Sequence, residues 1–463
     1  MSRAFDAIVI GAGQAGPPLA VRLGAAGMRV ALIERHLFGG TCVNTGCTPT
    51  KTLVASAYVA HIARRAADYG VDIGGAVGGS VGVDLKKAKA RADAVVMNSR
   101  KGVESWLRDA PGVTVIQGHA AFEGPHSLRV GSDVLTASQI FINVGGRALV
   151  PDFPGVGDVP YLTNTSMLAL DTLPRHLIVV GGSYIGLEFA QIYRRFGAEV
   201  TVVEKGPRLI AREDEDVSEA IQKILEDEGI SVRTQAECLA FKPHPEGISA
   251  RVDCTSGDPD LIGSHVLLAV GRVPNTADLG LDRAGIATDA KGYITVDDEL
   301  RTSVAGVWAL GDCNGRGAFT HTAYNDYEIV AANLLDGEHR HVSERIPAYA
   351  LYIDPPLGRV GMTEAQARAS GRPLLVNHRP MTRVSRAIEK GETQGFMKVV
   401  ADRETQRILG AAILGVNGDE AIHGIIDMMS AGQPYTAFQR AVPIHPTVSE
   451  LIPTLVSGMR APD

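Results

Sequence analysis

Residues 7–16 read AIVIGAGQAG, an apolar run followed at once by a glycine-rich turn. A strand that ends in the pattern G-x-G-x-x-G and passes into a helix is typical of a dinucleotide-binding unit. Gly11 would permit the tight turn, Gly13 would let the backbone approach a pyrophosphate, and Gly16 would let helix and strand pack closely. We therefore expect a nucleotide to bind where the strand meets the helix N-terminus.

The residues after this turn complete a strand–helix–strand unit. Residues 19–26 suit a helix, and residues 30–33 suit a second strand that Glu34 closes. A carboxylate about 20 residues beyond the glycines can accept hydrogen bonds from ribose hydroxyls. Strand, turn, helix and acid together make an ordinary tight turn the weaker interpretation.

The same pattern recurs near the middle of the chain, with elements predicted at residues 177–180, 187–196 and 199–203. Gly181 and Gly186 fill the first and third turn positions, and Ser183 replaces the middle glycine. Such a repeat indicates two nucleotide-binding units. Glu204 would repel a 2′-phosphate, which favours NADH, although Lys205 and Arg208 lie close enough in sequence to leave NADPH open.

Residues 39–51 read GGTCVNTGCTPTK and carry two thiols five positions apart. Cys42 and Cys47 can close a small disulfide if the turn between them lets their Cα atoms approach. A helix that begins there would stabilise a thiolate. A zinc site would need two further ligands, and the sequence holds no second close Cys/His pair. We interpret the pair as redox-active, because a structural disulfide needs an oxidising compartment.

Composition narrows the class of protein. The chain has 463 residues, 45% hydrophobic and 21% charged, so two or three domains with ample cores are expected. A formal net charge of −7 argues against nucleic acid as a partner. No apolar run reaches the roughly 20 residues of a membrane helix, and we expect no secretory signal. Cys238, Cys254 and Cys313 lack partners at meaningful spacing, and such sparse cysteines favour a cytoplasmic location.

Outside the two units, the residue pattern predicts further elements. We expect helices over residues 51–69, 84–108 and 419–431, and strands over residues 113–117, 139–144, 306–310, 395–400 and 408–414. Glycines in residues 74–82 predict a flexible connection, and Pro151, Pro154 and Pro160 mark a boundary. The composition changes beyond about residue 345, which indicates a separate C-terminal α+β domain.

Several motifs together resemble the class I pyridine nucleotide-disulfide oxidoreductases, the flavoproteins that include glutathione reductase, dihydrolipoamide dehydrogenase and mercuric reductase. Besides the two glycine turns and the cysteine motif, these are GRVPN at residues 271–275, Gly311-Asp312 after a strand, and HPT at residues 445–447. The motifs follow the family's order over almost the whole chain. The resemblance implies an α/β fold with two Rossmann-like domains, for FAD and NAD(P), and a C-terminal α+β dimerisation domain.

The resemblance also implies domain limits and binding residues. FAD would be bound by residues 1–150 and 274–342, NAD(P) by residues 151–273, and dimerisation would fall to residues 343–463. The FAD contacts would be Gly11, Gly13, Gly16, Glu34, Lys51, Gly145, Asp312, Thr322 and Ala323. The NAD(P) contacts would be Gly181, Ser183, Tyr184, Gly186, Glu204, Gly271 and Arg272, with Tyr184 as a movable gate. We assign no metal ligands.

The catalytic roles implied by the resemblance centre on the cysteine pair. Cys47 would lie against the flavin as the charge-transfer thiolate, and Cys42 would be the interchange thiol that meets the substrate. Lys51 would sit near flavin N5, paired with Glu188, where a cation stabilises reduced, anionic flavin.

Thiol–disulfide exchange also needs a group that accepts and returns a proton. His445 suits this task, and Glu450 could orient its ring and favour the cation. In the family this histidine reaches the cysteine pair of the other subunit, so the resemblance implies a homodimer.

Three functions remain open at this point. The first is NAD(P)H-driven reduction of a small-molecule or lipoyl-type disulfide, or its reverse. The second is reduction of metal ions, quinones or oxidants; mercury is disfavoured because the sequence ends without vicinal cysteines, lacks an N-terminal metal-binding extension, and has His445 where tyrosine is expected. The third is a non-catalytic flavin redox sensor, against which Lys51, Glu188, His445 and Glu450 argue.

Overall fold

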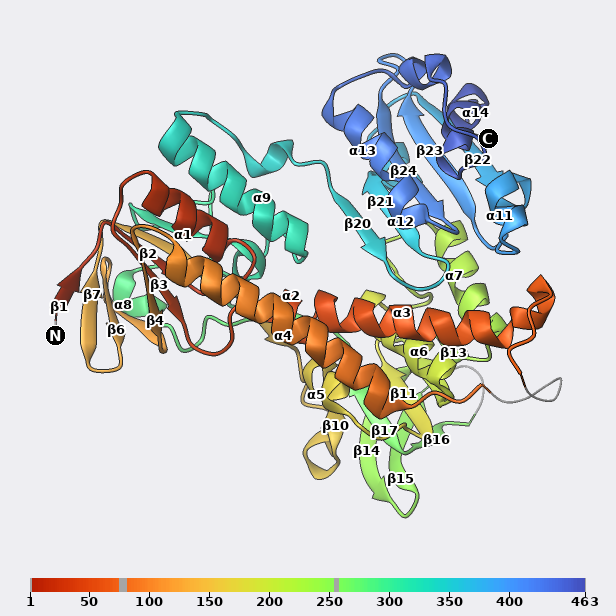
Figure 1. Ribbon diagram of the computed structural model, residues 1–463, viewed down its shortest axis with the longest axis horizontal. Helices are drawn as coiled ribbons and strands as arrows, with labels where there is room; N and C mark the ends of the chain where they lie inside the picture. The colour runs from red at the N-terminus through yellow and green to blue at the C-terminus, as the bar shows by residue number, and fades with distance from the viewer. Residues whose placement is uncertain (1, 75–80, 254–257, 463) are drawn as a thin grey trace.

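The computed structural model describes residues 2–74, 81–253 and 258–462, which form three lobes (Figure 1). Residues 75–80 of the predicted connection, Cys254 and the side chain of Cys238 lie outside this description. The N-terminal lobe lies at the left of the view, the green and yellow middle lobe at the bottom, and the blue C-terminal lobe at the upper right (Figure 1).

The N-terminal lobe is built on a parallel five-stranded sheet whose strand order is β19-β8-β2-β3-β4. Its strands are β2 (Ala7–Ile10), β3 (Val30–Glu34), β4 (Val113–Gln117), β8 (Gln139–Ile142) and β19 (Val307–Ala309). Strand β19 follows the whole middle lobe in the sequence. Residues far apart in sequence therefore share one sheet.

Alternate residues of these strands enter two cores, because successive side chains point to opposite faces of a sheet. Val9 packs towards α1 (Gly16–Ala25) and α9 (Thr320–Ala331). Ile8 packs towards a second sheet on the other face. That sheet has the order β1-β7-β6-β5, with β1 (Ser2–Ala4), β5 (Ala120–Gly124), β6 (Ser127–Val130) and β7 (Asp133–Thr136).

The middle lobe repeats the plan with the parallel order β10-β17-β11-β12-β13. Its elements are β10 (Tyr161–Leu162), β11 (His176–Val180), α6 (Tyr184–Phe196), β12 (Glu199–Val203), α7 (Glu215–Asp227), β13 (Ser231–Arg233) and β17 (His265–Leu268). An antiparallel sheet of β14 (Glu237–His244), β15 (Gly247–Asp253) and β16 (Asp260–Gly263), absent from the sequence-based expectation, covers it. The pair β9 (Gly146–Ala148) and β18 (Arg272–Pro274) runs between the two lobes.

The C-terminal lobe is an antiparallel sheet of order β20-β21-β24-β23-β22. Its strands are β20 (Ala348–Leu351), β21 (Leu357–Gly361), β22 (Leu374–Pro380), β23 (Phe396–Asp402) and β24 (Ile408–Leu414). Its helices are α10 (Glu364–Ala369), α11 (Ser385–Glu389), α12 (Gly418–Ala421), α13 (His423–Ser430) and α14 (Ile452–Ser457). The helix predicted over residues 419–431 is therefore two helices.

Helices near the cysteine motif join the lobes (Figure 1). They are α2 (Gly40–Thr45), α3 (Cys47–Arg64) and α4 (Leu85–Asp109), with the shorter α5 (Asn164–Ala169) and α8 (Leu281–Ala284) elsewhere. The helix expected over residues 51–69 thus begins earlier and ends earlier, before a short 3-10 turn at Ala66–Tyr69. One buried core includes Leu53 of α3, Leu187 of α6 and Leu351 of β20, so it joins α3 to the middle and C-terminal lobes.

Candidate active site

The two thiols sit on different helices that meet at Gly46. Cys42 lies within α2, and Cys47 is the first residue of α3. A Cβ atom at Gly46 would come 2.9 Å from the Thr41 carbonyl oxygen, so the break needs a residue without a side chain. Both cysteines are free thiols and line one pocket.

The surroundings of the pair shift the pKa values of the two thiols in opposite directions. A hydrogen bond from Cys42 lowers the pKa of Cys47 to about 6, and Thr320 and Lys51 act in the same direction. Thr320 Oγ1 lies 3.3 Å from Cys47 Sγ. The same bond with Cys47, together with burial, raises the pKa of Cys42. The pair therefore gives up a proton more readily at Cys47 than at Cys42.

Lys51 lies one helical turn beyond Cys47 and is held from two directions. Its Nζ is 2.5 Å from Glu188 Oε2 and 4.6 Å from the ring centroid of Tyr352. The Glu188 side chain is buried, whereas that of Lys51 remains 33% exposed. The pair expected from the resemblance is thus brought together in the structure, with an aromatic face added.

The first glycine turn requires close packing. A Cβ atom at Gly11 would lie 2.3 Å from the Asn143 carbonyl oxygen, and one at Gly16 would lie 2.1 Å from the Gly11 carbonyl oxygen. Only glycine fits either position. The Glu34 carboxylate accepts hydrogen bonds from the amides of Ala12 at 2.8 Å and His36 at 2.7 Å.

The second turn reproduces this geometry. Gly181 and Gly186 have equally close approaches of 2.5 Å and 2.1 Å for an added Cβ atom. The Glu204 carboxylate accepts from the amides of Gly182 and Gly206, both at 2.7 Å. Ser183 is the residue that precedes α6, and its side chain makes no capping bond there.

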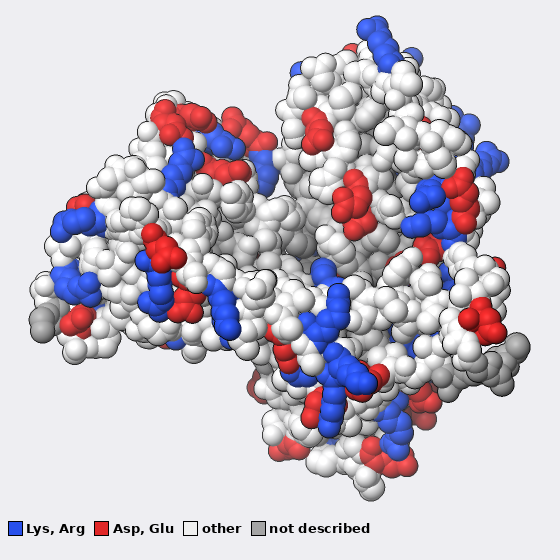
Figure 2. All heavy atoms as spheres, in the orientation of Figure 1, with Lys and Arg blue, Asp and Glu red and all other residues white. Residues whose placement is uncertain are grey.

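A pocket of about 720 Å³ brings most of the expected residues together. Its lining includes Gly11, Gly13, Glu34, Cys42, Cys47, Lys51, Gly145, Tyr184, Glu188, Arg272, Asp312 and Ala323. The turn at Gly11, the N-terminus of α1 that follows it and a carboxylate at the strand end fit the pyrophosphate and ribose of FAD. On the face shown in Figure 2, the molecule is hollowed between the lobe that holds α9 and the C-terminal lobe.

Arg272 and Asp312 share one wall of this pocket. Arg272 Nε lies 3.7 Å from Asp312 Oδ2, and its Nη2 donates to the Gly146 carbonyl. Arg272, expected at NAD(P), therefore lies beside a residue expected at FAD. Thr322 lies in α9, and Gly271 lies just before β18. Both are near this wall, but neither lines the pocket.

Tyr184 closes another side of the pocket through an aromatic group. Its ring lies 5.4 Å from that of Phe319, which stacks on Tyr349 at 5.6 Å and on His321 at 5.4 Å. Tyr349 in turn donates to the buried carboxylate of Glu213. The expected gate thus rests on residues of both the N-terminal and the C-terminal lobes.

His445 and Glu450 form a pair away from this pocket. Nδ1 of His445 is 2.8 Å from Glu450 Oε2, and the histidine side chain is 72% exposed. Val442 and Ile444, just before it, are 96% and 79% exposed. A single chain therefore does not bring His445 into its own cysteine pocket.

Sequence reasoning missed Thr320, which contacts Cys47, and Tyr352, which contacts Lys51. Thr320 lies two residues before the expected Thr322, so its place at the start of α9 was a usable signal. For Tyr352 no motif marks its contact, because the residues it meets lie 164 positions away or more.

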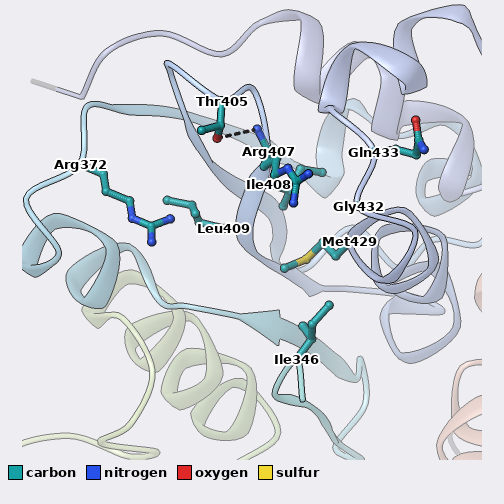
Figure 3. A pocket seen from close by; sticks show the side chains of 9 residues that line it. All are labelled: Ile346, Arg372, Thr405, Arg407, Ile408, Leu409, Met429, Gly432 and Gln433. Atoms are coloured by element: carbon teal, nitrogen blue, oxygen red, sulfur yellow. Dashed lines mark hydrogen bonds between the residues drawn. The ribbon is translucent and has the colours of Figure 1, made fainter. Parts of the chain in front are cut away.

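A second hollow, of about 580 Å³, lies in the C-terminal lobe (Figure 3). Its lining is Ile346, Arg372, Thr405, Arg407, Ile408, Leu409, Met429, Gly432 and Gln433. None of these nine residues is a cysteine, histidine or carboxylate, so the candidate active site is the pocket of the cysteine pair. In the described residues, no three His, Cys, Asp or Glu side chains are grouped to hold a metal ion.

The family model described as pyridine nucleotide-disulphide oxidoreductase matches residues 5–326. The chain belongs to this family. The dimerisation-domain model of the same family matches residues 347–456, which supports a homodimer. The predicted α/β fold, the use of FAD and NAD(P)H, and oxidoreductase activity on disulfides are therefore confirmed.

Named relatives agree with this assignment. "Probable pyridine nucleotide-disulfide oxidoreductase RclA" of Escherichia coli is 38% identical over 98% of this chain and 99% of the relative. Dihydrolipoyl dehydrogenase of Thermus scotoductus is 32% identical over 97% and 96%, and mercuric reductase of Streptomyces lividans is 32% identical over 96% and 93%.

A solved structure, described as HOCl-induced flavoprotein disulfide reductase RclA from Escherichia coli, matches with a TM-score of 0.88 and 37% identity, covering 98% of this chain and 99% of that one. A Cu(II) complex of the same protein matches equally well. No helix in the described ranges is both long and apolar enough to cross a membrane.

Proposed function

We propose that this enzyme reduces disulfides through Cys42 and Cys47, with Cys47 on the flavin side and Cys42 as the exchanging thiol. The proposal is carried by the placement of both thiols in one pocket, where Thr320 Oγ1 lies 3.3 Å from Cys47 Sγ; the pKa of Cys47 is lowered there and that of Cys42 is raised. A relay needs two such unlike sulfurs, because one must hold charge at rest and the other must meet a substrate.

The exchange balances with these residues. Cys42 gives up its proton and attacks one sulfur of the substrate disulfide, whose S–S bond breaks as the first thiolate leaves and takes a proton. Cys47 then attacks Cys42, which releases the second thiolate and forms the Cys42–Cys47 disulfide. Two electrons pass from the dithiol to the substrate. When bound, FAD carries two electrons from NAD(P)H to restore the dithiol.

FAD would be held by the first glycine turn, Glu34, Asp312, Gly145, Thr322 and Ala323, with Lys51 and Glu188 beside the cysteines. Lys51 supplies a fixed positive charge near Cys47, and Glu188 keeps that ammonium in place. A preorganised cation of this kind stabilises developing negative charge. NAD(P)H would meet the second turn, with Gly271, Arg272 and the gate Tyr184 nearby.

His445 of the partner subunit would accept the Cys42 proton and return it to the leaving thiolate. Support comes from its exposed ring, its bond to Glu450, and its position outside the pocket of its own chain. NADH is the proposed donor, because the Glu204 carboxylate stands where a 2′-phosphate would bring further negative charge. A cytoplasmic location is proposed with it, since NADH is supplied there.

The substrate is proposed to be a small-molecule or lipoyl-type disulfide. Similarity to RclA over nearly the whole chain supports the reductive direction, because that relative is described as a disulfide reductase. The dihydrolipoyl dehydrogenase relatives support the same chemistry in reverse. A comparison of NADH with disulfides against NAD with dihydrolipoamide would establish which direction is faster.

A second candidate function is metal-ion reduction by the same thiols. It is supported by the Cu(II) complex of RclA and by the mercuric reductase relatives. The two functions differ in their need for proton transfer. Replacing His445 by alanine should strongly lower the rate of disulfide reduction and leave the rate of metal-ion reduction nearly unchanged.

Anaerobic titration with NADH, followed by absorbance, tests the main proposal. Long-wavelength charge-transfer absorbance after two electrons is expected, because the Cys47 thiolate would then face oxidised flavin. Bleaching without that band would exclude the cysteines from the electron path and favour the redox-sensor reading. A Cys42→Ser variant should keep reduction by NADH but lose disulfide turnover.

A further inference from the structure

One face of α6 is polar and yet buried. Glu188, Gln191 and Arg195 lie three and four positions apart, so they share that face, and each is only 4% exposed. Buried polar side chains of this kind need specific partners. Gln191 and Arg195 both bond to the Glu228 carboxylate, and Glu188 pairs with Lys51. All three side chains also bond to a short segment of the C-terminal lobe just after β20.

The segment 352–354 bonds to this face along its length. The amide of Tyr352 donates to Glu188 Oε1 at 3.1 Å, and the amide of Asp354 donates to Gln191 Oε1 at 2.7 Å. Gln191 also donates to the Asp354 carbonyl at 2.9 Å. Arg195 pairs with the Asp354 carboxylate at 2.7 Å. The C-terminal lobe is thereby fixed to the helix that carries Glu188.

Tyr352 contacts both members of the Lys51–Glu188 pair. Its amide binds one carboxylate oxygen of Glu188, while Lys51 binds the other at 2.5 Å. Its ring lies 4.6 Å from the Lys51 ammonium. A ring face attracts a cation without adding a second negative charge, so it helps to confine the Lys51 ammonium.

We propose that Tyr352 is a positioning residue for Lys51, and that through it the dimerisation domain sets the redox balance between the flavin and the cysteine pair. The inference deepens the proposed function and rests on Lys51 acting near the flavin. Segment 352–354 belongs to the lobe that pairs with a second subunit. Subunit association would therefore affect the position of the Lys51 ammonium.

The test compares two substitutions in the FAD-loaded dimer. Tyr352→Phe keeps the ring and the amide, whereas Tyr352→Leu keeps only the amide. Charge-transfer absorbance after two electrons, and the reduction equilibrium against a reference dye, are measured for each. The Leu variant should shift the equilibrium towards oxidised flavin by roughly 3- to 30-fold, and the Phe variant should match the wild type.

A double-mutant cycle with Lys51→Met gives a readout that a merely structural role would not move. In that background, Tyr352→Leu should have no further effect on the equilibrium. An unchanged equilibrium in the Leu variant, equal effects of Phe and Leu, or an undiminished effect without Lys51 would each overturn the inference. Should the Leu variant not fold, Tyr352→Met gives the same reading, since its side chain fills the space without a ring.

The failures are distinguishable. A wild-type enzyme without charge-transfer absorbance would contradict the proposed function, whatever Tyr352 does. A wild-type enzyme with the band and a Leu variant that behaves identically would contradict only the role of Tyr352.

Discussion

Nδ1 of His445 lies 2.8 Å from Oε2 of Glu450, and the two side chains differ sharply in exposure, at 72% and 13%. The bond occupies one ring nitrogen and leaves Nε2 for proton transfer. A largely shielded carboxylate therefore orients an imidazole that is otherwise accessible to another molecule.

His445→Ala should lower the rate of disulfide reduction by about 10²- to 10⁴-fold, which is the usual contribution of a positioned acid–base group. Reduction of the enzyme by NADH should be unaffected, because that half-reaction needs no proton from His445. Stopped-flow absorbance separates the two half-reactions. A variant slowed equally in both would show that His445 acts on folding or assembly instead.

Thr320→Val should raise the pKa of Cys47 by about one pH unit. The substitution removes the hydroxyl whose oxygen lies 3.3 Å from Cys47 Sγ, and with it a hydrogen bond that stabilises the thiolate. In the wild type, charge-transfer absorbance should be present above pH 6 and lost as the pH falls through about 6. Absorbance of the two-electron-reduced enzyme against pH gives the midpoint. A midpoint that does not move in the variant would count against this hydrogen bond.

Val442→Glu should weaken the dimer and with it disulfide turnover, because this 96% exposed apolar side chain lies three residues before His445. Sedimentation velocity would measure the fraction of dimer. Reduction of the enzyme by NADH should persist in the monomer. Ile262→Glu, at an apolar residue that is 38% exposed in β16, serves as the matched control and should change neither. Full turnover by a monomeric Val442 variant would mean that the partner's His445 is not required.

Glu204→Ala should raise the KM for NADH about tenfold, since the carboxylate organises two amides of the second turn. The KM for NADPH should change less, because repulsion of the 2′-phosphate is removed as well. Steady-state kinetics with both nucleotides gives the ratio. The alternative is that Lys205 and Arg208 set the preference, in which case the ratio would not change.

Local patterns in the sequence predicted the nucleotide-binding framework well. An added Cβ atom would collide with the backbone at Gly11, Gly16 and their counterparts Gly181 and Gly186. The spacing of these glycines therefore follows directly from the geometry of the turns. The cysteine motif was equally informative, although the break at Gly46, which puts Cys42 and Cys47 on separate helices, was not foreseen.

Contacts between distant segments could not be predicted in this way. Gln191 and Arg195 look like the polar face of an ordinary surface helix, and only tertiary packing buries them under residues about 160 positions away. Tyr352 likewise gives no local sign that it meets Lys51. Strands β20 to β22 were not predicted, and their order in the sheet depends on pairing across the whole lobe.

The core shared by Leu53, Leu187 and Leu351 makes the stability of the middle and C-terminal lobes depend on α3 and on each other. Exposing any one of these side chains opens the same apolar cluster, so local unfolding of either lobe costs free energy in both. Heating should therefore unfold these two lobes in one cooperative transition, measurable as a single calorimetric peak. The Cys42–Cys47 pair, which lies beside this core where α2 meets α3, would lose its geometry in that same transition.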